Sequence, residues 1–312
     1  MKRIIIYSLA IVLLIYFVIL LYPKTETSSP NSKGIKNMTI NNLENTQTIP
    51  GGGELTDKSN NEGKKIKVAL LDSGISKEHP DLLEKIVKEF NSTKLPNVDN
   101  LGHGTSIAGI LTANDNDFGI VGVSQNIDIY SAKVIHDDGK IIKQEFINGM
   151  EWAISNDVDV INLSLGFDKA FPELKDSIAK AIDSGIVVIA ASGNNYGQNA
   201  QFPARYKEVI SVGAIDMNLK PLKVSAIGKV DFVAPGEDII SSDKNGGYST
   251  FNGTSFSTAF VTGIVAEYLS QYNIQKNKET QSVVYEYLKS NSTKLEFSKE
   301  IVGNGIPKLN SK

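Results

Sequence analysis

Runs of aliphatic and β-branched residues alternate with amphipathic stretches from about residue 66 onward. Near-continuous apolar runs are typical of strands buried on both faces of a parallel sheet. Stretches with apolar residues three and four positions apart are typical of the helices that cover such a sheet. We therefore predict an α/β fold, with a doubly wound, mostly parallel sheet and helices on both faces. The predicted strands are 67–71, 129–135, 158–165, 186–190 and 209–214, and the predicted helices are 106–113, 146–156, 173–183 and 256–269.

A different pattern precedes this region, because residues 4–22 are apolar with the single exception of Ser8. A helix of that length, rising about 1.5 Å per residue, nearly crosses a hydrocarbon core of roughly 30 Å. Lys2 and Arg3 come before it, and no small-x-small cleavage site follows it. We expect residues 1–22 to form one N-terminal hydrophobic helix that anchors the chain in the cell membrane, with the rest extracellular. The alternative is a long signal peptide whose removal releases a secreted protein.

Composition indicates the domain organisation and excludes several classes of function. Residues 23–46 are polar and rich in Asn, Ser and Thr, which predicts a tether, and residues 47–312 are left as the folded domain. The 32 basic residues against 35 acidic ones give a net charge of −3, so no basic surface is expected for nucleic acid. The chain has no cysteine, which excludes disulfides, thiolate metal sites and thiol catalysis. We expect a monomer.

Three glycine-flanked polar residues carry the candidate chemistry. Asp72 ends a predicted strand, His103 lies between two glycines, and Ser255 precedes the predicted helix 256–269. A serine hydroxyl is a weak nucleophile until a histidine takes its proton, and that histidine needs a carboxylate to orient it. Singly, the three residues have ordinary interpretations as a turn residue, a tight turn and a helix N-cap. Together, in the order Asp, His, Ser, they indicate nucleophilic catalysis.

The segments around these residues resemble the subtilisin family of serine proteases, and the resemblance extends from about residue 47 to residue 310. It implies a serine endopeptidase that acts on a peptide or protein through an acyl-enzyme. Ser255 would be the nucleophile, His103 the base and then the acid, and Asp72 the residue that orients His103. Asn194 matches the family's oxyanion asparagine. The matching segments include 68–75, 79–82, 102–105, 160–166, 190–194, 252–255 and 303–305.

The resemblance also implies where a substrate binds. An extended peptide would lie between two backbone segments, of which one is Gly139, Lys140 and Ile141 and the other is Ser164, Leu165 and Gly166. The pocket for the residue before the scissile bond would be lined by 164–166, 191–193 and 195–202, which contain no Asp or Glu. A buried cation needs a carboxylate partner, so we predict a preference for neutral residues there, with Asn195 and Gln201 as polar contacts. An acid such as Asp168 or Glu173 that reaches into this pocket is the alternative.

A calcium site is the one cofactor that the resemblance implies. Its ligands would be the side chains of Gln47, Asp81 and Asn116 and the carbonyl oxygens of Phe118 and Ile120. Mixed carboxylate, amide and carbonyl oxygens are the ligands that Ca²⁺ prefers. We expect a structural Ca²⁺ ion.

The sequence departs from the family in three places. Residues 256–259 read Phe-Ser-Thr-Ala where the family usually has Met-Ala-x-Pro, and Ser106 stands where the family often has a second His. Residues 23–46 are too few for the family's prodomain. Small anchored members resemble the proteases that remove leader peptides from lantibiotics, which is the substrate hypothesis. The alternatives are a general secreted protease and a catalytically silent scaffold that binds peptides. An α/β-hydrolase esterase is disfavoured, because G-x-S-x-G is absent around Ser255.

Overall fold

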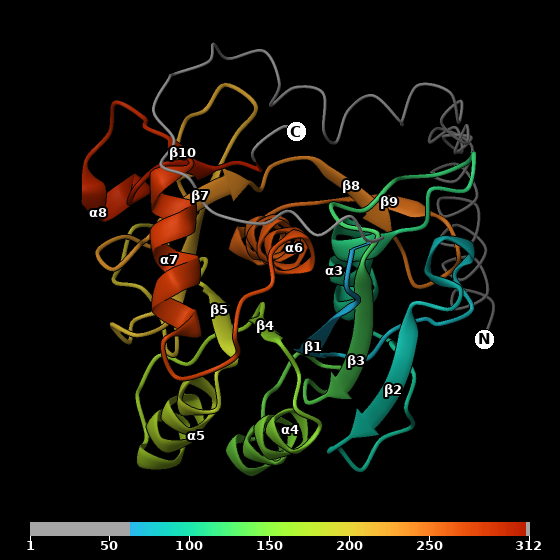
Figure 1. The fold of residues 1–312 in the computed structure, drawn as a ribbon. Helices are drawn as coiled ribbons and strands as arrows, with labels where there is room; N and C mark the ends of the chain where they lie inside the picture. Colours follow the sequence, from blue (N-terminus) through green and yellow to red (C-terminus); the bar gives the residue numbers. More distant parts are fainter. Residues whose placement is uncertain (1–62, 310–312) are drawn as a thin grey trace, which may run out of the picture.

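A parallel sheet of seven strands forms the centre of the protein (Figure 1). The structure is a computed structural model that describes residues 63–309. The strand order β2-β3-β1-β4-β5-β6-β7 places β1 between β3 and β4. The chain therefore fills the sheet toward β2 on one side of β1 and toward β7 on the other, and the strand order reverses between β1 and β4. Ligands bind at such a switch point in doubly wound sheets. The strands are β1 (Ile66–Asp72), β2 (Ile86–Asn91), β3 (Ile127–Lys133), β4 (Val160–Leu163), β5 (Val187–Ala191), β6 (Ile210–Ile215) and β7 (Phe232–Pro235).

Helices cover both faces of this sheet, as the sequence predicts. In Figure 1, α4 (Lys143–Ser155) and α5 (Pro172–Asp183) lie below the sheet. On the upper side lie α3 (His103–Thr112), α6 (Thr254–Gln271) and α7 (Thr280–Ser290). Each face has its own apolar core, so residues of one strand alternate between the two cores. Val68 and Leu70 belong to the upper core, and Ala69 and Leu71 belong to the lower one.

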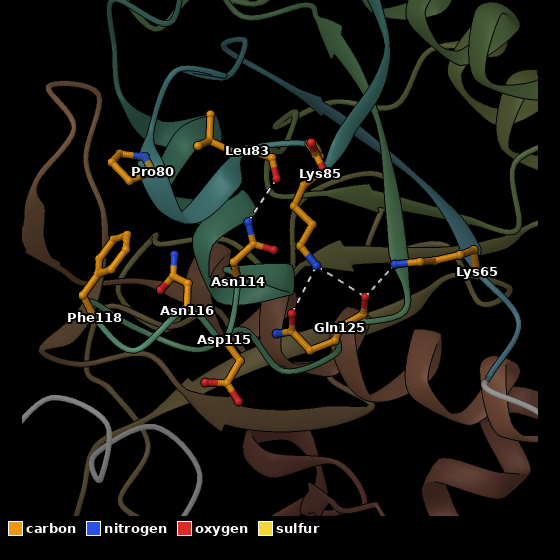
Figure 2. A pocket seen from close by; sticks show the side chains of 10 residues that line it. Lys65, Pro80, Leu83, Lys85, Asn114, Asp115, Asn116, Phe118 and Gln125 are labelled. Atoms are coloured by element: carbon orange, nitrogen blue, oxygen red, sulfur yellow. Dashed lines mark hydrogen bonds between the residues drawn. The ribbon is translucent and has the colours of Figure 1, made fainter.

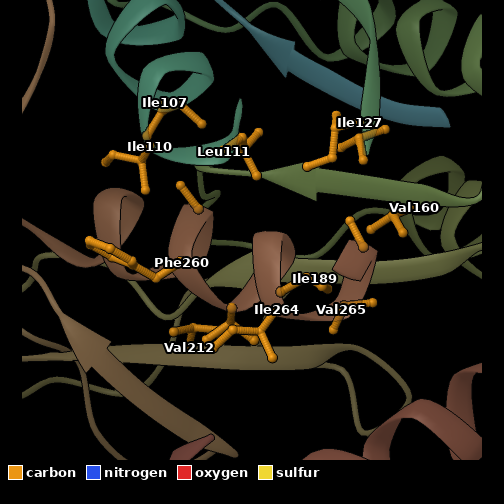
Figure 3. Close-up of a cluster of buried hydrophobic side chains, with 14 of the residues drawn as sticks. Ile107, Ile110, Leu111, Ile127, Val160, Ile189, Val212, Phe260, Ile264 and Val265 are labelled. Carbon is orange, nitrogen blue, oxygen red and sulfur yellow. The ribbon is translucent and has the colours of Figure 1, made fainter. Parts of the chain in front are cut away.

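Helix α6 is the centre of the upper core (Figure 3). Its side chains pack against α3 and against the middle strands, and nearly all of its residues are buried. Burial on all sides explains why its sequence is apolar without a clear polar face. The helix is therefore held firmly along its length, and its N-terminus has a fixed position above the carboxyl ends of the strands. The residues shown in Figure 3 include Ile107, Ile110 and Leu111 of α3, Phe260, Ile264 and Val265 of α6, and Ile127, Val160, Ile189 and Val212 of the sheet.

The smaller elements lie at the periphery. An antiparallel pair, β8 (Ile239–Ser242) and β9 (Tyr248–Phe251), packs beside α3. A second antiparallel pair, β10 and β11, lies near the end of the described chain. The remaining bounds are η1 (Pro80–Leu82), β10 (Ser292–Thr293), α8 (Lys299–Val302) and β11 (Ile306–Pro307).

Several predicted boundaries need correction. The predicted strand 158–165 is shorter, because only Val160–Leu163 pair with neighbours. Helix α3 begins at His103, three residues before the predicted start. Strand β2 was not predicted, because it lies at the sheet edge and none of its residues is fully buried. The predictions for 1–22, for 23–46 and for Gln47 lie outside the described residues. No helix within residues 63–309 is long and apolar enough to cross a membrane.

Candidate active site

Asp72 and His103 meet at the carboxyl end of β1. Asp72 is the last residue of β1, and His103 is the first residue of α3. His103 Nδ1 lies 2.7 Å from Asp72 Oδ1, and because a carboxylate is an acceptor, Nδ1–H is the donor. The Asp72 side chain is 1% exposed and the His103 side chain 24% exposed. The imidazole therefore has one nitrogen held by a buried carboxylate and a solvent-accessible edge.

Glycine at position 104 permits this close approach. A Cβ atom on Gly104 would lie 2.1 Å from the carbonyl oxygen of Gly74, a distance that no side chain tolerates. The start of α3 can therefore pack directly on the turn that follows β1 only because Gly104 has no side chain. Glycine beside His103 is thus explained by packing.

Ser255 lies in the first turn of α6. It is the second residue of the helix and does not precede it, which corrects the predicted helix start at residue 256. Its hydroxyl donates to the carbonyl oxygen of Ser164 at 3.0 Å, and Ser164 Oγ donates to the carbonyl oxygen of Ser255 at 3.0 Å. The ring of the next residue, Phe256, lies 5.7 Å from the His103 ring between centroids. The first turn of α6, which carries Ser255, thus lies near His103, and the Ser255 hydroxyl points toward Ser164.

The Asn194 side chain completes the arrangement from the loop after β5. Its Oδ1 accepts hydrogen bonds from Thr254 N at 3.0 Å and from Thr254 Oγ1 at 3.2 Å. Its Nδ2 is left as a donor beside Gly253, because a Cβ atom on Gly253 would lie 2.7 Å from Nδ2. The Ser255 backbone N–H lies in the same first turn of α6, where the N–H groups have no partner four residues back in the helix. Backbone and side-chain donors of this kind can stabilise an oxyanion.

The electrostatic surroundings favour a positive charge on His103. Burial lowers the pKa of His103. The charge of Asp72, its hydrogen bond to Nδ1 and the charge of Asp99 raise the pKa, and together they outweigh burial. The net result is a pKa above the usual 6.5. A histidine poised in this way can accept a proton near neutral pH and stabilise the resulting charge.

The two predicted substrate segments follow β3 and β4, which flank β1. In the first, His136 N donates to the carbonyl oxygen of Lys140 at 2.9 Å, and Ile135 pairs with Ile141 in an antiparallel bridge. Gly139, at the turn between them, has a φ of +81° with open space around it. The second segment, 164–166, continues directly from β4. One segment therefore leaves the sheet on each side of Asp72.

Gln201 occupies the space between two walls of the predicted specificity pocket. A Cβ atom on Gly166 would lie 2.7 Å from Gln201 Oε1, and one on Gly193 would lie 2.5 Å from the same oxygen. The Gln201 amide nitrogen donates to Asp168 Oδ1 at 2.7 Å. The predicted polar contact is therefore a side chain that fills part of the pocket, and the nearby acid is engaged by it.

Four of the five predicted calcium ligands lie in the described residues, around the buried Asp81 carboxylate. Asp81 Oδ1 accepts from Asn116 Nδ2 at 3.0 Å, and Oδ2 accepts from Tyr248 OH at 2.7 Å and from Ile120 N at 3.2 Å. Asn116 Oδ1 is buried with no hydrogen-bond partner within residues 63–309, as expected for an atom that fits a cation. Among these residues no group of three or more His, Cys, Asp and Glu forms a metal cluster.

An open hollow of about 700 Å³ adjoins the loop that carries Asn116 (Figure 2). Asn116 and Phe118 line one side of it, and Lys65, Lys85 and Gln125 line the other. Burial and the charge of Lys65 lower the pKa of Lys85 to about 8. The lysine side of the hollow is therefore poorly suited to a cation, whereas the Asn116 side offers oxygen ligands.

A doubly wound parallel sheet with an Asp–His pair at its switch point and a serine at the adjoining helix N-terminus defines a serine peptidase of the subtilisin type. The sequence model of the subtilase family matches residues 63–305, so the chain belongs to this family and is a serine endopeptidase. It is 39% identical over 236 residues to Subtilisin DY of Bacillus licheniformis, covering 72% of this chain and 86% of that protein.

Two further relatives show the same relation. Subtilisin amylosacchariticus of Bacillus subtilis subsp. amylosacchariticus is 39% identical over 225 residues, which are 70% of this chain and 59% of that protein. An intracellular serine protease of Paenibacillus polymyxa is 36% identical over 275 residues, with 83% and 84% covered. The relatives thus include a protein named as intracellular as well as subtilisins, so family membership leaves the compartment open.

Proposed function

We propose that this chain is a membrane-tethered, extracellular serine endopeptidase in which Ser255, His103, Asp72 and Asn194 carry the chemistry. The observation that supports this most directly is the 2.7 Å contact of His103 with Asp72 beside the N-terminus of α6. The tether and the compartment are inferred from the apolar run in residues 1–22. Residues 47–312 form the peptidase domain in this proposal.

The reaction begins when the Ser255 hydroxyl turns from the Ser164 carbonyl toward His103 Nε2. Ser255 Oγ attacks the carbonyl carbon of the scissile bond while Nε2 accepts its proton, and Asp72 stabilises the imidazolium. The oxyanion is held by the Ser255 N–H and by Asn194 Nδ2. His103 then gives the proton to the leaving amine, which breaks the C–N bond and leaves an acyl-enzyme. Water, deprotonated by His103, attacks the ester, and Ser255 regains its proton.

A substrate in this proposal adds a strand between residues 139–141 and 164–166, with main-chain hydrogen bonds on both edges. The side chain before the scissile bond meets Gln201, whose position between Gly166 and Gly193 supports selection of small, neutral residues. The Asp168 carboxylate lies behind the Gln201 amide at 2.7 Å. An incoming Arg or Lys would have to displace this amide to reach it.

Removal of a leader from an exported peptide is the physiological role that we propose. Its support is the apolar run in residues 1–22, which predicts a surface tether, together with the two backbone segments that flank Asp72. The likeness to lantibiotic leader peptidases rests on analogy. A general secreted protease is the competing role if residues 1–22 are cleaved. A catalytically silent scaffold is disfavoured, because all four chemical positions are filled.

A structural Ca²⁺ ion is the second part of the proposal. Asp81, Asn116 and the carbonyl oxygens of Phe118 and Ile120 would hold it, with Gln47 as a further ligand. The unpartnered Asn116 Oδ1 beside a buried carboxylate supports this assignment. Bound there, the ion would link the η1 turn to the loop that follows α3 and add stability without taking part in peptide hydrolysis.

Titration with a serine-reactive phosphonate tests the catalytic assignment. One equivalent of phosphonate should label one chain of the purified protein and abolish peptidase turnover. Ser255→Ala should remove both labelling and turnover, whereas Ser184→Ala, at the exposed C-terminal end of α5, should change neither. Full turnover by the Ser255→Ala protein would overturn the mechanism.

A further inference from the structure

A second buried carboxylate lies beside the Asp72–His103 pair. Asp99, in the loop before α3, is 2% exposed. Its Oδ1 accepts from Ser73 Oγ at 2.7 Å and from Gly102 N at 2.7 Å. Its Oδ2 accepts from Thr105 N at 2.9 Å and from Thr105 Oγ1 at 2.6 Å. All four contacts are donors, as a buried carboxylate requires, because burial without them is costly.

The groups that Asp99 binds flank both members of the catalytic pair. Ser73 immediately follows Asp72, and Gly102 and Thr105 lie on either side of His103. Ser73 Oγ also accepts a hydrogen bond from Gly104 N at 2.9 Å. The carboxylate therefore joins the end of β1 to the first turn of α3.

Lys133 holds the same region from β3. It is fully buried, and its Nζ donates to the carbonyl oxygens of Ser73 at 2.7 Å and of Val98 at 3.0 Å. A third donation, at 2.9 Å, goes to Asp137 Oδ1. The lysine thus binds the residues next to Asp72 and next to Asp99. Its charge is balanced by Asp137, which leaves the Asp99 carboxylate to its neutral donors.

We propose that Asp99 is a positioning residue: its hydrogen bonds fix the imidazole of His103 against Asp72, and its buried charge stabilises the imidazolium that forms during catalysis. This inference rests on the proposed role of His103 as the catalytic base. It assigns Asp99 no contact with the substrate, and it makes the Ser73 hydroxyl the link between the two catalytic segments.

The charged groups around His103 determine the direction in which its pKa should change when Asp99 is replaced. Asp72 approaches from β1 and Asp99 from the loop before α3, and both raise the pKa of His103 against the effect of burial. From the β8–β9 turn, the Lys244 side chain packs against Gly102, and its Nζ donates to the Asn100 carbonyl oxygen. Lys133 acts through Ser73, and α6 contributes the apolar ring of Phe256. Loss of the Asp99 charge therefore lowers the pKa of His103.

Two variants separate the charge from the positioning. Asp99→Asn removes the charge and replaces one acceptor oxygen by an NH2 group, whereas Ser73→Ala removes the link and keeps the charge. Each should lower kcat by about 10²-fold with little change in KM, since small displacements of a catalytic group have effects of that size. The acid limb of the kcat/KM profile should move to lower pH in Asp99→Asn and stay in place in Ser73→Ala. Asp183→Asn, at the exposed end of α5, is the matched control and should change nothing.

The assay uses the full chain and a chromogenic peptide with a neutral residue before the scissile bond. Phosphonate labelling of the wild-type protein and its loss in Ser255→Ala test the proposed function separately, so a failure of that function is recognised independently. If Asp99→Asn does not fold, Ser73→Ala decides the positioning, and full kcat in that variant overturns it. An unmoved acid limb in folded Asp99→Asn overturns the electrostatic part.

Discussion

The Ser255 hydroxyl is not yet aligned for reaction, since it donates to the Ser164 carbonyl oxygen. One neutral hydrogen bond contributes about 0.5–1.5 kcal/mol net, so turning this hydroxyl toward His103 costs little compared with the barrier that the enzyme lowers. The positions that are expensive to rearrange, Asp72 in the strand and Asn194 against Thr254, are already in place. Catalysis thus needs one rotation about a side-chain bond.

Asn194→Ala should lower kcat by about 10²–10³-fold, which is the established cost of removing this kind of donor in a subtilisin. Ser255→Ala should be more severe, because it removes the bond-forming atom itself. Steady-state kinetics on one peptide substrate compares the two. Equal losses would assign Asn194 a structural role, through its contacts with Thr254, and melting curves of both variants would show that directly.

The pH profile follows from the raised pKa of His103. Only the neutral imidazole can accept the Ser255 proton, so kcat/KM falls as the pH falls through this pKa. The Asp72 and Asp99 charges outweigh burial, so the half-maximal pH should lie above 6.5. NMR titration of His103 in the Ser255→Ala protein should give a pKa that is also above 6.5. An acid limb below 6.5 would contradict this balance of charges.

The catalytic residues could be predicted from the sequence because few residue types can perform their roles and glycines mark their positions. Asp99 could not be found in this way. It lies in the stretch 97–101, which has no helix or strand pattern and is typical of a loop. Its burial depends on contacts with Ser73 and Thr105, which the sequence does not indicate. Gln201 was expected only as a polar contact, because its place between two glycines is set by tertiary packing.

Among the elements, the buried strands were predictable and the edges were not. Strand β1 is apolar throughout because it lies between two cores, and its near-continuous pattern identifies it. Strand β2 has a neighbour on one side only, and its exposed Lys88 and Glu89 carry no strand signal. The start of α6 was placed two residues late, because Thr254 and Ser255 read as a cap whereas Gly253 is the N-cap in the structure.

The segments after β4 and β5 determine which residue is accepted before the scissile bond. Gln201→Ala removes the amide between Gly166 and Gly193. In this variant, kcat/KM for peptides with a large apolar residue before the scissile bond should rise at least about tenfold relative to peptides with alanine at that position. The space gained is worth about 1–3 kcal/mol per methylene accommodated. Gln275→Ala, exposed in the loop after α6 and outside the pocket, is the control. A peptide library should show selection for neutral residues in the wild-type protein, and selection for Arg or Lys would contradict the assignment.

At the scale of the molecule, the strand order brings together segments that are far apart in the sequence. Asp72 ends the inner strand β1, and the substrate segments leave its two neighbours β3 and β4, so all three lie at the carboxyl ends of adjacent strands. The hydrophobic pattern predicts parallel strands and their helices, but it does not fix their order, which depends on how the helices pack. The location of the site at the switch point therefore became clear only from the structure.

The calcium proposal predicts a property of the whole molecule. An ion bound only by the native state stabilises it by about 2.7 kcal/mol when its free concentration is roughly 100 times Kd. A chelator should then lower the melting temperature by roughly 5–10 °C. Asn116→Ala should remove most of this response, whereas Asn218→Ala, in an exposed turn after β6, should retain it. Calorimetry in calcium and in chelator measures the difference. Identical curves in both buffers, with the Asn116→Ala protein equally indifferent, would mean that the donors Asn116 Nδ2, Tyr248 OH and Ile120 N satisfy Asp81 without an ion.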